Sequence, residues 1–485
     1  MELQVGGMEF LDLMSGAQKK PEYLAINPRG KAPGMVDGDV KIGESNAILR
    51  YLAMQYQPAL YPVHDKAACY QIDFALEAFG NMVYPNHVKV IYPVMGFAGP
   101  PDNQAAANKE LAEKTAQWCK EHLTGKFVRG STLSIADFKA APFLFSQIQP
   151  NVKRNCGFTA AQRVVKYCED FCAAVKASGF MTSAGGYSIA EFIASKSDAK
   201  PMPATPSVEV SGTSGRIPGM AASPGSVKVH GAPMSQNCIG PIMVAMATQA
   251  GKMQMVDVMN GGLKTPEYLA INPMGQMPGL EDGTIKGGES LAILRYLGMS
   301  YGRGQLYPTS KPKVTAKIDF ALEDFCSSVY EAHVGVVYAT MGFTDMPDDK
   351  ATPASKYNEA MESWAAFHLK AGKYVVGDAL SIADYKAVPF FFAATQPGVL
   401  KKFPALQPPA RLFIGGVHCD EDELKSLKVF GRLRARWIQC QSTALVSLRA
   451  LACMMGLRSA CSVQTTLSLR CAHRGGHRNL QYQQR

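Results

Sequence analysis

Apolar residues recur at helical spacing in two long parts of this chain. They are Ile72, Ala75, Leu76 and Phe79 in the first part, and Ile318, Ala321, Leu322, Phe325 and Val329 in the second. Spacings of three and four residues put such side chains on one face of a helix. The pattern therefore predicts helices from about residue 63 to 182 and again from about residue 309 to 403.

Short apolar runs precede each helical part. Met8–Met14, Val227–Val229 and Met253–Met259 have the length and composition of strands, and Ile242–Met246 continues as an apolar helix. These runs predict a fold of the α/β plus all-α class, in which a small mixed domain comes before each set of helices.

One stretch of sequence occurs twice without a gap. Residues Pro21–Leu52 and Pro266–Leu297 both begin with PEYLAINP and end with ILRYL, so that Pro278 stands 245 residues after Pro33. In the second copy, turn residues follow Asn272, and Asp-Gly at 282–283 predicts a hairpin. An apolar helix follows, and we expect Ser290 to cap it.

This repeated stretch resembles the soluble glutathione transferases. The resemblance rests on Asn-Pro-x-Gly-x-x-Pro, then Asp-Gly, then Glu-Ser at the start of a helix. It implies a thioredoxin-like domain followed by an all-helical domain, twice in tandem. A capping box supports the helical domains, because Ser134–Asp137 recurs as Ser381–Asp384.

The resemblance and the composition together divide the chain into six parts. A linker rich in Ser, Gly, Pro and Ala separates the two copies, and an irregular basic tail ends the chain. The alternative for the tail is a segment that contacts acidic partners. The expected boundaries are 1–62 (truncated thioredoxin-like), 63–182 (helical), 183–225 (linker), 226–308 (thioredoxin-like), 309–403 (truncated helical) and 404–485 (tail).

The resemblance assigns a glutathione-binding site to the second copy. Glu289 and Ser290 are expected to hold the γ-glutamyl amino and carboxylate groups, and a helix N-terminus suits such a carboxylate. Met277 precedes a proline that is cis in the family. The full expected set is Lys264, Gln276, Met277, Pro278, Glu289 and Ser290. The first copy keeps a vestigial set, namely Lys31, Ala32, Pro33, Glu44 and Ser45.

Two residues compete for the catalytic role. VKVHGAPMS resembles the opening of the serine-type (phi and theta) members, whose catalytic serine falls on Ser235. Members usually carry an arginine in the next helix, whereas Gly240-Pro241 stands here, so we expect that helix to begin late. A shifted loop would bring Cys238 to glutathione instead, although a small buried residue is the ordinary role of such a cysteine. His230 is expected to be a bystander.

A hydrophobic substrate pocket is expected beside this site. The resemblance places it along Tyr330, His333, Val337 and Met341, although ordinary core packing explains any one of these residues equally well.

Charge and cysteine content exclude several other classes. The net charge is +10, but residues 411–485 hold twelve Lys and Arg against four Asp and Glu, so most of the excess positive charge lies in the tail. The two copies are together nearly neutral, which argues against a nucleic-acid partner. The twelve cysteines include no CxxC and no metal-ligand spacing, which favours a reducing compartment and no metal. No apolar run is long enough for a membrane span, and the start does not resemble a signal peptide. We therefore expect a cytoplasmic protein.

The first copy lacks an opening segment that the second copy has. About twenty residues from Ser226 precede Met246, which corresponds to Met1. In the family this segment holds a central strand and the catalytic loop. We therefore expect the first copy to be inactive and poorly stable, because its sheet would carry unpaired backbone groups.

These expectations define a function and two alternatives. The second copy would activate glutathione as a thiolate for conjugation to small hydrophobic electrophiles or for peroxide reduction, a detoxification role, in a homodimer or an intramolecular pseudo-dimer. The first alternative is a non-catalytic binding or scaffold module like the gamma subunit of elongation factor 1. The second is a glutathione thiol-transferase that depends on Cys238.

Overall fold

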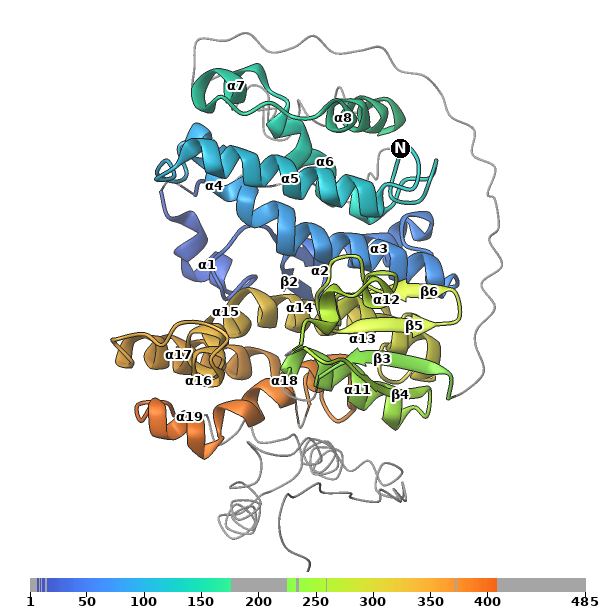
Figure 1. The fold of residues 1–485 in the computed structure, drawn as a ribbon, viewed down its shortest axis with the longest axis vertical. Coiled ribbons are helices and arrows are strands. Elements are labelled where there is room, and N and C mark those ends of the chain that lie inside the picture. Colours follow the sequence, from blue (N-terminus) through green and yellow to red (C-terminus); the bar gives the residue numbers. More distant parts are fainter. Residues whose placement is uncertain are drawn as a thin grey trace, which may run out of the picture.

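A computed structural model describes residues 7, 9, 11–13, 15–175, 225–232, 235–258, 260–370, 372 and 374–407. The chain forms two bodies of helices, each with a small sheet, and they lie one against the other (Figure 1). The expected linker, apart from Gly225, and the expected tail beyond Gln407 lie outside the described residues.

The second half opens with a four-stranded sheet in the order β4-β3-β5-β6. Strand β3 pairs with β4 in parallel and with β5 antiparallel, and β5 pairs with β6. Helix α11 connects β3 to β4 and packs on both strands. The bounds are β3 (Val227–Gly231), α11 (Gln236–Ala247), β4 (Gly251–Met255), 3-10 helix η4 (Gly262–Lys264), α12 (Pro266–Leu269), β5 (Gly279–Asp282) and β6 (Ile285–Gly287).

Helices complete the second half. They are α13 (Ser290–Tyr301), α14 (Pro312–Asp324), the π-helix η5 (Phe325–Tyr330), α15 (Glu331–His333), the π-helix η6 (Val334–Tyr338), α16 (Ala339–Met341), α17 (Ala351–His368), α18 (Ile382–Ala394) and α19 (Pro397–Lys402). The predicted capping box is confirmed, because the Ser381 side chain accepts the backbone N–H of Asp384 and the Ser381 backbone N–H donates to Asp384 Oδ2 at 2.8 Å. The first half has the same box, in which the Ser134 backbone N–H donates to Asp137 Oδ2 at 2.8 Å.

Among its described residues, the first half has a two-stranded sheet. Its elements are 3-10 helix η1 (Ala17–Lys19), α1 (Pro21–Leu24), β1 (Gly34–Asp37), β2 (Val40–Gly43), α2 (Ser45–Tyr56), 3-10 helix η2 (Pro58–Leu60), α3 (Lys66–Ala78), the π-helix η3 (Phe79–Val83), α4 (Tyr84–Met95), α5 (Gln104–His122), α6 (Ile135–Gln147), α7 (Pro150–Cys156) and α8 (Gln162–Val175).

The predicted strand Met8–Met14 is wrong for the positions that the structure describes. None of residues 7, 9 and 11–13 is in a strand. The corresponding strand of the second half, β4, pairs with β3, and no described residue of the first half forms a counterpart of β3. Without that partner the backbone groups of the run have no ladder to join.

The same absence leaves one side of β1 open. Gly34 is exposed, whereas its counterpart Gly279 is buried beside β3. Val36, two residues further along β1, is 50% exposed.

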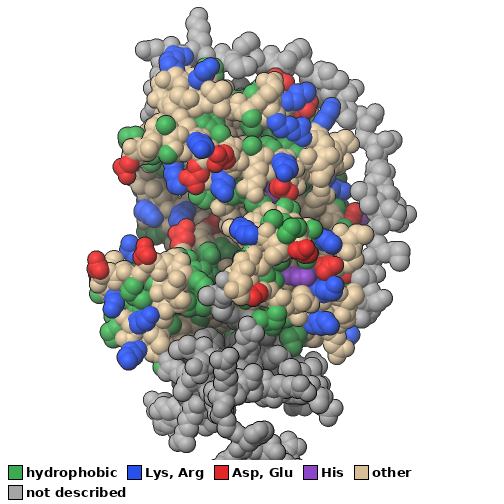
Figure 2. Space-filling model, in the orientation of Figure 1, with side chains coloured by type: hydrophobic (Ala, Val, Ile, Leu, Met, Phe, Trp, Pro, Cys, Tyr) green, Lys and Arg blue, Asp and Glu red, His purple; other side chains and the backbone are tan. Residues whose placement is uncertain are grey.

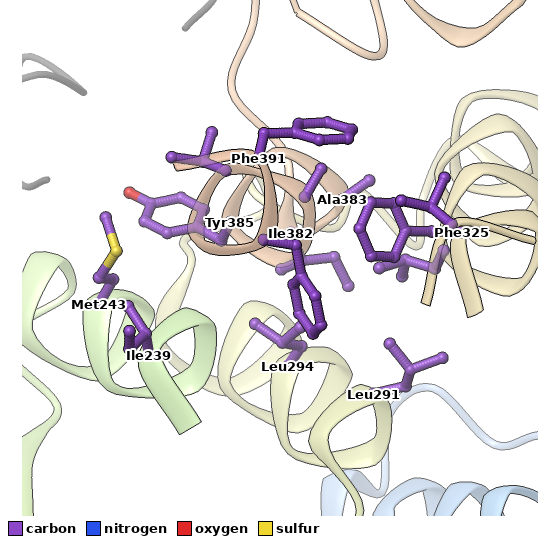
Figure 3. Close-up of a cluster of buried hydrophobic side chains, with 14 of the residues drawn as sticks. Ile239, Met243, Leu291, Leu294, Phe325, Ile382, Ala383, Tyr385 and Phe391 are labelled. Atoms are coloured by element: carbon purple, nitrogen blue, oxygen red, sulfur yellow. The ribbon is translucent and has the colours of Figure 1, made fainter. Parts of the chain in front are cut away.

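Helix α18 occupies the centre of the second half. Figure 3 shows Ile382 and Tyr385 of α18 facing side chains of α11 and α13. Gly240 makes the close approach possible, since a β-carbon there would lie 2.6 Å from the Tyr385 carbonyl oxygen. The predicted late start of α11 is wrong, because the helix begins at Gln236 and includes Pro241. Packing against α18 holds the helix although Pro241 lacks an N–H.

The two halves share an apolar and a charged contact. Helix α14 packs on α2, and α13 packs on α3. The apolar cluster joins Val40, Ile42, Ala47 and Tyr51 of the first half to Ala316 and Phe320 of the second. The incomplete first sheet is therefore covered on one face by the second half.

Buried charges lie at the centre of this contact. The Arg50 guanidinium bonds to Glu323 at 2.6 Å and to Glu77 at 2.9 Å. Arg295 bonds to the same two carboxylates, at 2.7 and 2.8 Å. Each arginine thus joins its own half to the other.

On the face in Figure 2, acidic and basic side chains are intermixed. Among the described residues, no helix combines the length and hydropathy needed to cross a bilayer.

Candidate functional site

The turn before β5 is held by hydrogen bonds to its own backbone. The Met277–Pro278 peptide bond is cis. The Gln276 carbonyl oxygen accepts bonds from Tyr268 Oη and Asn272 Nδ2, both at 2.6 Å. Lys264 Nζ lies 3.3 Å from the Gly275 carbonyl oxygen, so in this structure it is directed toward the same turn. None of these bonds from Lys264, Tyr268 and Asn272 goes to the backbone of Met277.

The first copy preserves this turn. Its Ala32–Pro33 bond is cis as well. The Lys31 carbonyl oxygen accepts from Tyr23 Oη at 2.9 Å and from Asn27 Nδ2 at 2.7 Å. The repeated Asn-Pro-x-Gly-x-x-Pro sequence therefore encodes one local backbone structure in both halves.

Strand pairing places the end of β3 beside this turn. His230 at the end of β3 pairs with Gly279, the residue after Pro278. Ser235, at the N-terminus of helix α11, follows four residues after Gly231. Ser235 is the N-cap residue of α11 and is 6% exposed, and its carbonyl accepts the backbone N–H of Cys238 at 2.9 Å. A hydroxyl at this position lies at the positive end of the helix dipole.

Cys238 is a core residue in this arrangement. It is fully buried, and a β-carbon on Gly231 would lie 2.6 Å from its sulfur. Burial raises the pKa of the Cys238 thiol to about 11, so the thiol is protonated at neutral pH. Reactive cysteines are accessible and have a lowered pKa, and Cys238 has neither property.

Glu289 and Ser290 stand at the start of α13, but not in the expected roles. The predicted Ser290 cap is wrong, because α13 begins at Ser290 and Glu289 occupies the N-cap position with φ 66°. Glu289 makes no side-chain capping bond. Ser290 is instead the first residue of the helix. Its hydroxyl faces the start of α11, and its Oγ lies 3.4 Å from Asn237 Oδ1.

The Glu289 carboxylate is bound by the other half of the chain. Asn81 Nδ2 donates to Glu289 Oε2 at 2.8 Å. Burial raises the pKa of Glu289 to about 7, while the Asn81 bond and the Lys386 charge act in the opposite direction. The first half shows the reverse arrangement, in which Ser327 Oγ donates to Glu44 Oε1 at 2.9 Å.

Lys386 is a site residue that sequence reasoning missed. It lies on α18, is 2% exposed, and donates to Asn237 Oδ1 at 2.6 Å and to Ser290 Oγ at 3.0 Å. Its counterpart Lys139 donates to Ser45 Oγ at 2.6 Å. A lysine in an otherwise apolar helix, present in both copies two residues after the capping-box aspartate, was a signal that could have identified it.

The expected pocket residues lie on the helices beside α18. His333 is completely buried, and its Nδ1 lies 2.7 Å from Tyr357 Oη. Burial lowers the pKa of His333 to about 3, so this imidazole is neutral. Val337 is 1% exposed, while Tyr330 and Met341 are partly buried. Two of the four residues are thus core residues here, and the substrate pocket stays a prediction.

Among the residues that the structure describes, the remaining candidate site residues make no hydrogen bond to Lys386, Ser290 or Glu289. His230 Nε2 is 3.2 Å from Glu281 Oε2 on the sheet, where Lys228 binds the same carboxylate. Ala32 and Pro33 are exposed on the open side of the first sheet. Within the described ranges, no group of three or more His, Cys, Asp and Glu side chains could hold a metal ion.

Comparison with known proteins identifies related sequences. Residues 7–54 and 228–299 match the family described as "Glutathione S-transferase, N-terminal domain". Glutathione S-transferase F10 of Arabidopsis thaliana is 33% identical over 140 residues, which cover 27% of this chain and 65% of the relative. The probable glutathione S-transferase GSTF2 of Oryza sativa subsp. japonica is 32% identical over 146 residues, covering 28% and 67%.

A human relative matches to a similar degree. Glutathione S-transferase theta-2B of Homo sapiens is 31% identical over 150 residues, covering 28% of this chain and 59% of the relative. The chain belongs to the glutathione S-transferase family. It spans about two thirds of the length of the curated relatives that it matches first.

Proposed function

We propose that the second half, residues 226–407, is a glutathione transferase unit in which Ser235 activates the glutathione thiol. The observation that carries this proposal is the pairing of His230 with Gly279, which sets the end of the strand that precedes Ser235 beside the Met277–Pro278 turn. The start of α13, with Glu289 and Ser290, is joined to the start of α11 through Asn237. These two contacts support one shared site for the cysteinyl backbone, the γ-glutamyl group and the thiol.

The chemistry requires a thiolate. A free thiol of this kind has a pKa near ~8.5, so little thiolate is present at neutral pH. The Ser235 hydroxyl would donate a hydrogen bond to the sulfur, and the N-terminus of α11 would favour the negative charge. The thiolate then forms an S–C bond to an electrophilic carbon, and the leaving group departs with its electron pair. A peroxide oxygen is the other electrophile that this thiolate can attack.

We propose further that the first half is an inactive copy that takes the place of a dimer partner. It has no counterpart of β3 or of the Ser235 loop among the described residues. It supplies Asn81 to Glu289 and Glu77 to Arg295. This favours an intramolecular pseudo-dimer over pairing between chains. We place the protein in the cytoplasm, with glutathione and small hydrophobic electrophiles as its ligands.

Non-catalytic binding is the second candidate function. The cis turn and the Glu289–Ser290 pair alone would bind glutathione, and Lys264 in this structure contacts its own turn. A module that only binds glutathione has no need of a lowered thiol pKa. The Cys238-dependent thiol-transferase is disfavoured, because that thiol is buried and protonated.

Conjugation of glutathione to 1-chloro-2,4-dinitrobenzene tests the proposal. We expect the parent chain to be active and Ser235→Ala to lose about ten-fold or more in kcat/KM, which is ~1.4 kcal/mol of barrier. Cys238→Ala is the matched control, since it changes a neighbouring residue of the same helix and should retain activity. Loss of activity in Cys238→Ala but not in Ser235→Ala would support the thiol-transferase instead.

A further inference from the structure

A buried lysine without a counter-ion lies beside the Glu289–Ser290 pair. Lys386 is 2% exposed, yet it takes part in none of the ion pairs between the described residues. Glu289 and Glu77 influence it only at longer range. Burying an ammonium group without an anion is unfavourable, so the position requires an explanation beyond packing.

The hydrogen bonds around Lys386 leave one hydroxyl proton available. An ammonium group only donates, so Ser290 Oγ must accept the 3.0 Å bond from Lys386. The Ser290 proton then has Asn237 Oδ1 as its acceptor at 3.4 Å, and that oxygen already accepts from Lys386 at 2.6 Å. Bonds from a hydroxyl are normally about 2.5–3.0 Å long. The Ser290 hydroxyl is therefore prepared to donate to an incoming oxygen.

Backbone donors lie at the same place. The first N–H groups of a helix have no partner within the helix, and the N-cap residue Glu289 does not cap α13 with its side chain. An ammonium, a hydroxyl and uncapped amides thus favour an anion at the start of α13. The Glu289 carboxylate lies beside this anion position and would suit an amino group on the same ligand.

The same arrangement is present in the first half. Lys139 Nζ lies 2.6 Å from Ser45 Oγ and 5.3 Å from the centre of the Phe143 ring. Lys386 Nζ lies 4.9 Å from the centre of the Phe390 ring. Two copies that differ at many other positions have thus kept a lysine, a serine and an aromatic ring in one geometry.

We propose that Lys386 is a substrate-binding residue that supplies the counter-charge for the α-carboxylate of the γ-glutamyl group. This inference rests on the proposed function, because it places glutathione at the same site. Lys386 and Ser290 together would select thiols that carry this carboxylate over thiols that lack it.

Binding of two probes tests the inference without any catalytic step. The probes are S-methylglutathione and its analogue in which γ-aminobutyrate replaces the γ-glutamyl residue, so that only the α-carboxylate is missing. For the Lys386→Met variant we expect the dissociation constant of S-methylglutathione to rise about ten-fold or more, in line with a lost charged hydrogen bond. The constant of the analogue should stay within about two-fold of its value for the parent chain, since no carboxylate contact is lost.

Two controls separate binding from structure. Lys139→Met makes the same change in the first half and should leave the dissociation constant of S-methylglutathione unchanged. The unliganded Lys386→Met chain should unfold at the same denaturant concentration as the parent or at a higher one, because an uncompensated buried charge is removed. Lys386→Gln removes the charge but keeps a hydrogen-bond donor, and it serves if the Met variant does not fold.

Three outcomes would overturn the inference. They are equal weakening of both probes in the Lys386 variants, no weakening of either, and equal affinity of the parent chain for the two probes. Any of these can occur in a chain that conjugates glutathione normally, so they are distinct from failure of the proposed function. Conversely, a parent chain that binds the probes but does not conjugate glutathione would contradict the proposed function, and the test of Lys386 could still be carried out.

Discussion

At the scale of single residues, burial decides which candidate side chains carry charge near neutral pH. Cys238 stays protonated because the apolar core surrounds its sulfur, with a pKa of about 11. His333 is neutral for the same physical reason, with a pKa of about 3. Glu289 lies between these cases, because burial brings its pKa to about 7. Of the three, only Glu289 changes its charge within the physiological range.

Binding of glutathione should therefore depend on pH through Glu289. Below pH 7 the carboxyl group is largely protonated and cannot pair with the γ-glutamyl ammonium, and above pH 7 it is ionised. We expect the dissociation constant of S-methylglutathione to fall as pH rises from about 6 to 8. The methylated sulfur removes the thiol from the titration, so calorimetry at several pH values reports the site itself.

Glu289→Gln is the control for this dependence. It keeps an acceptor for the Asn81 amide but does not titrate. Its affinity should be weaker and nearly independent of pH over the same range. A variant that keeps the full pH dependence would show that another group is responsible.

At the scale of elements, local sequence predicted the two capping boxes but not the long-range contacts. The capping boxes depend on neighbouring residues, and the structure has them where the sequence placed them. The cis bond was expected from the family resemblance alone, and the predicted cap at Ser290 was wrong. The start of α11 depends on α18, more than 140 residues later, so its sequence alone gave the wrong boundary. Lys386 was missed for the same reason, since its partners lie on α11 and α13.

The close contact between α11 and α18 predicts a large effect at Gly240. A β-carbon there would lie 2.6 Å from a backbone oxygen of α18, which cannot move without shifting the helix. Gly240→Ala should lower the free energy of unfolding by about 1–3 kcal/mol. Gly335→Ala is the matched control, because the nearest atom to its β-carbon would be 3.8 Å away. Equal effects of the two changes in urea denaturation would contradict the packing account.

The open side of β1 predicts a difference in amide exchange. Strand β1 pairs only with β2, whereas β5 pairs with both β3 and β6. Backbone amides in Gly34–Asp37 should exchange faster with deuterium than those in Gly279–Asp282, because fewer of them are bonded. Equal protection of the two strands would mean that another segment covers β1.

At the scale of the whole molecule, the contact between the halves is built from equivalent residues. Arg50 and Arg295 each bond to both Glu77 and Glu323, which occupy matching places on α3 and α14. Such a contact is nearly self-complementary, as a two-fold interface is. Removing one member would leave buried charges without partners, at a cost of about 3–5 kcal/mol.

The near-symmetry predicts the behaviour of the second half alone. A protein limited to residues 225–407 would lose Glu77 from the environment of Arg295. We expect it to form a homodimer, in which Glu323 of the partner subunit replaces Glu77. Analytical ultracentrifugation measures this directly. A stable, folded monomer would show that the first half is not needed as a partner.

The ionisation of bound glutathione tests the central claim most directly. The thiolate absorbs in the ultraviolet, so its pKa can be titrated on the parent chain and on Ser235→Ala, each saturated with glutathione. The account predicts that the thiol bound to the parent titrates well below the ~8.5 of a free thiol, and that Ser235→Ala returns it toward that value. A bound thiol that titrates in the parent as it does in water would contradict the claim and indicate a binding module.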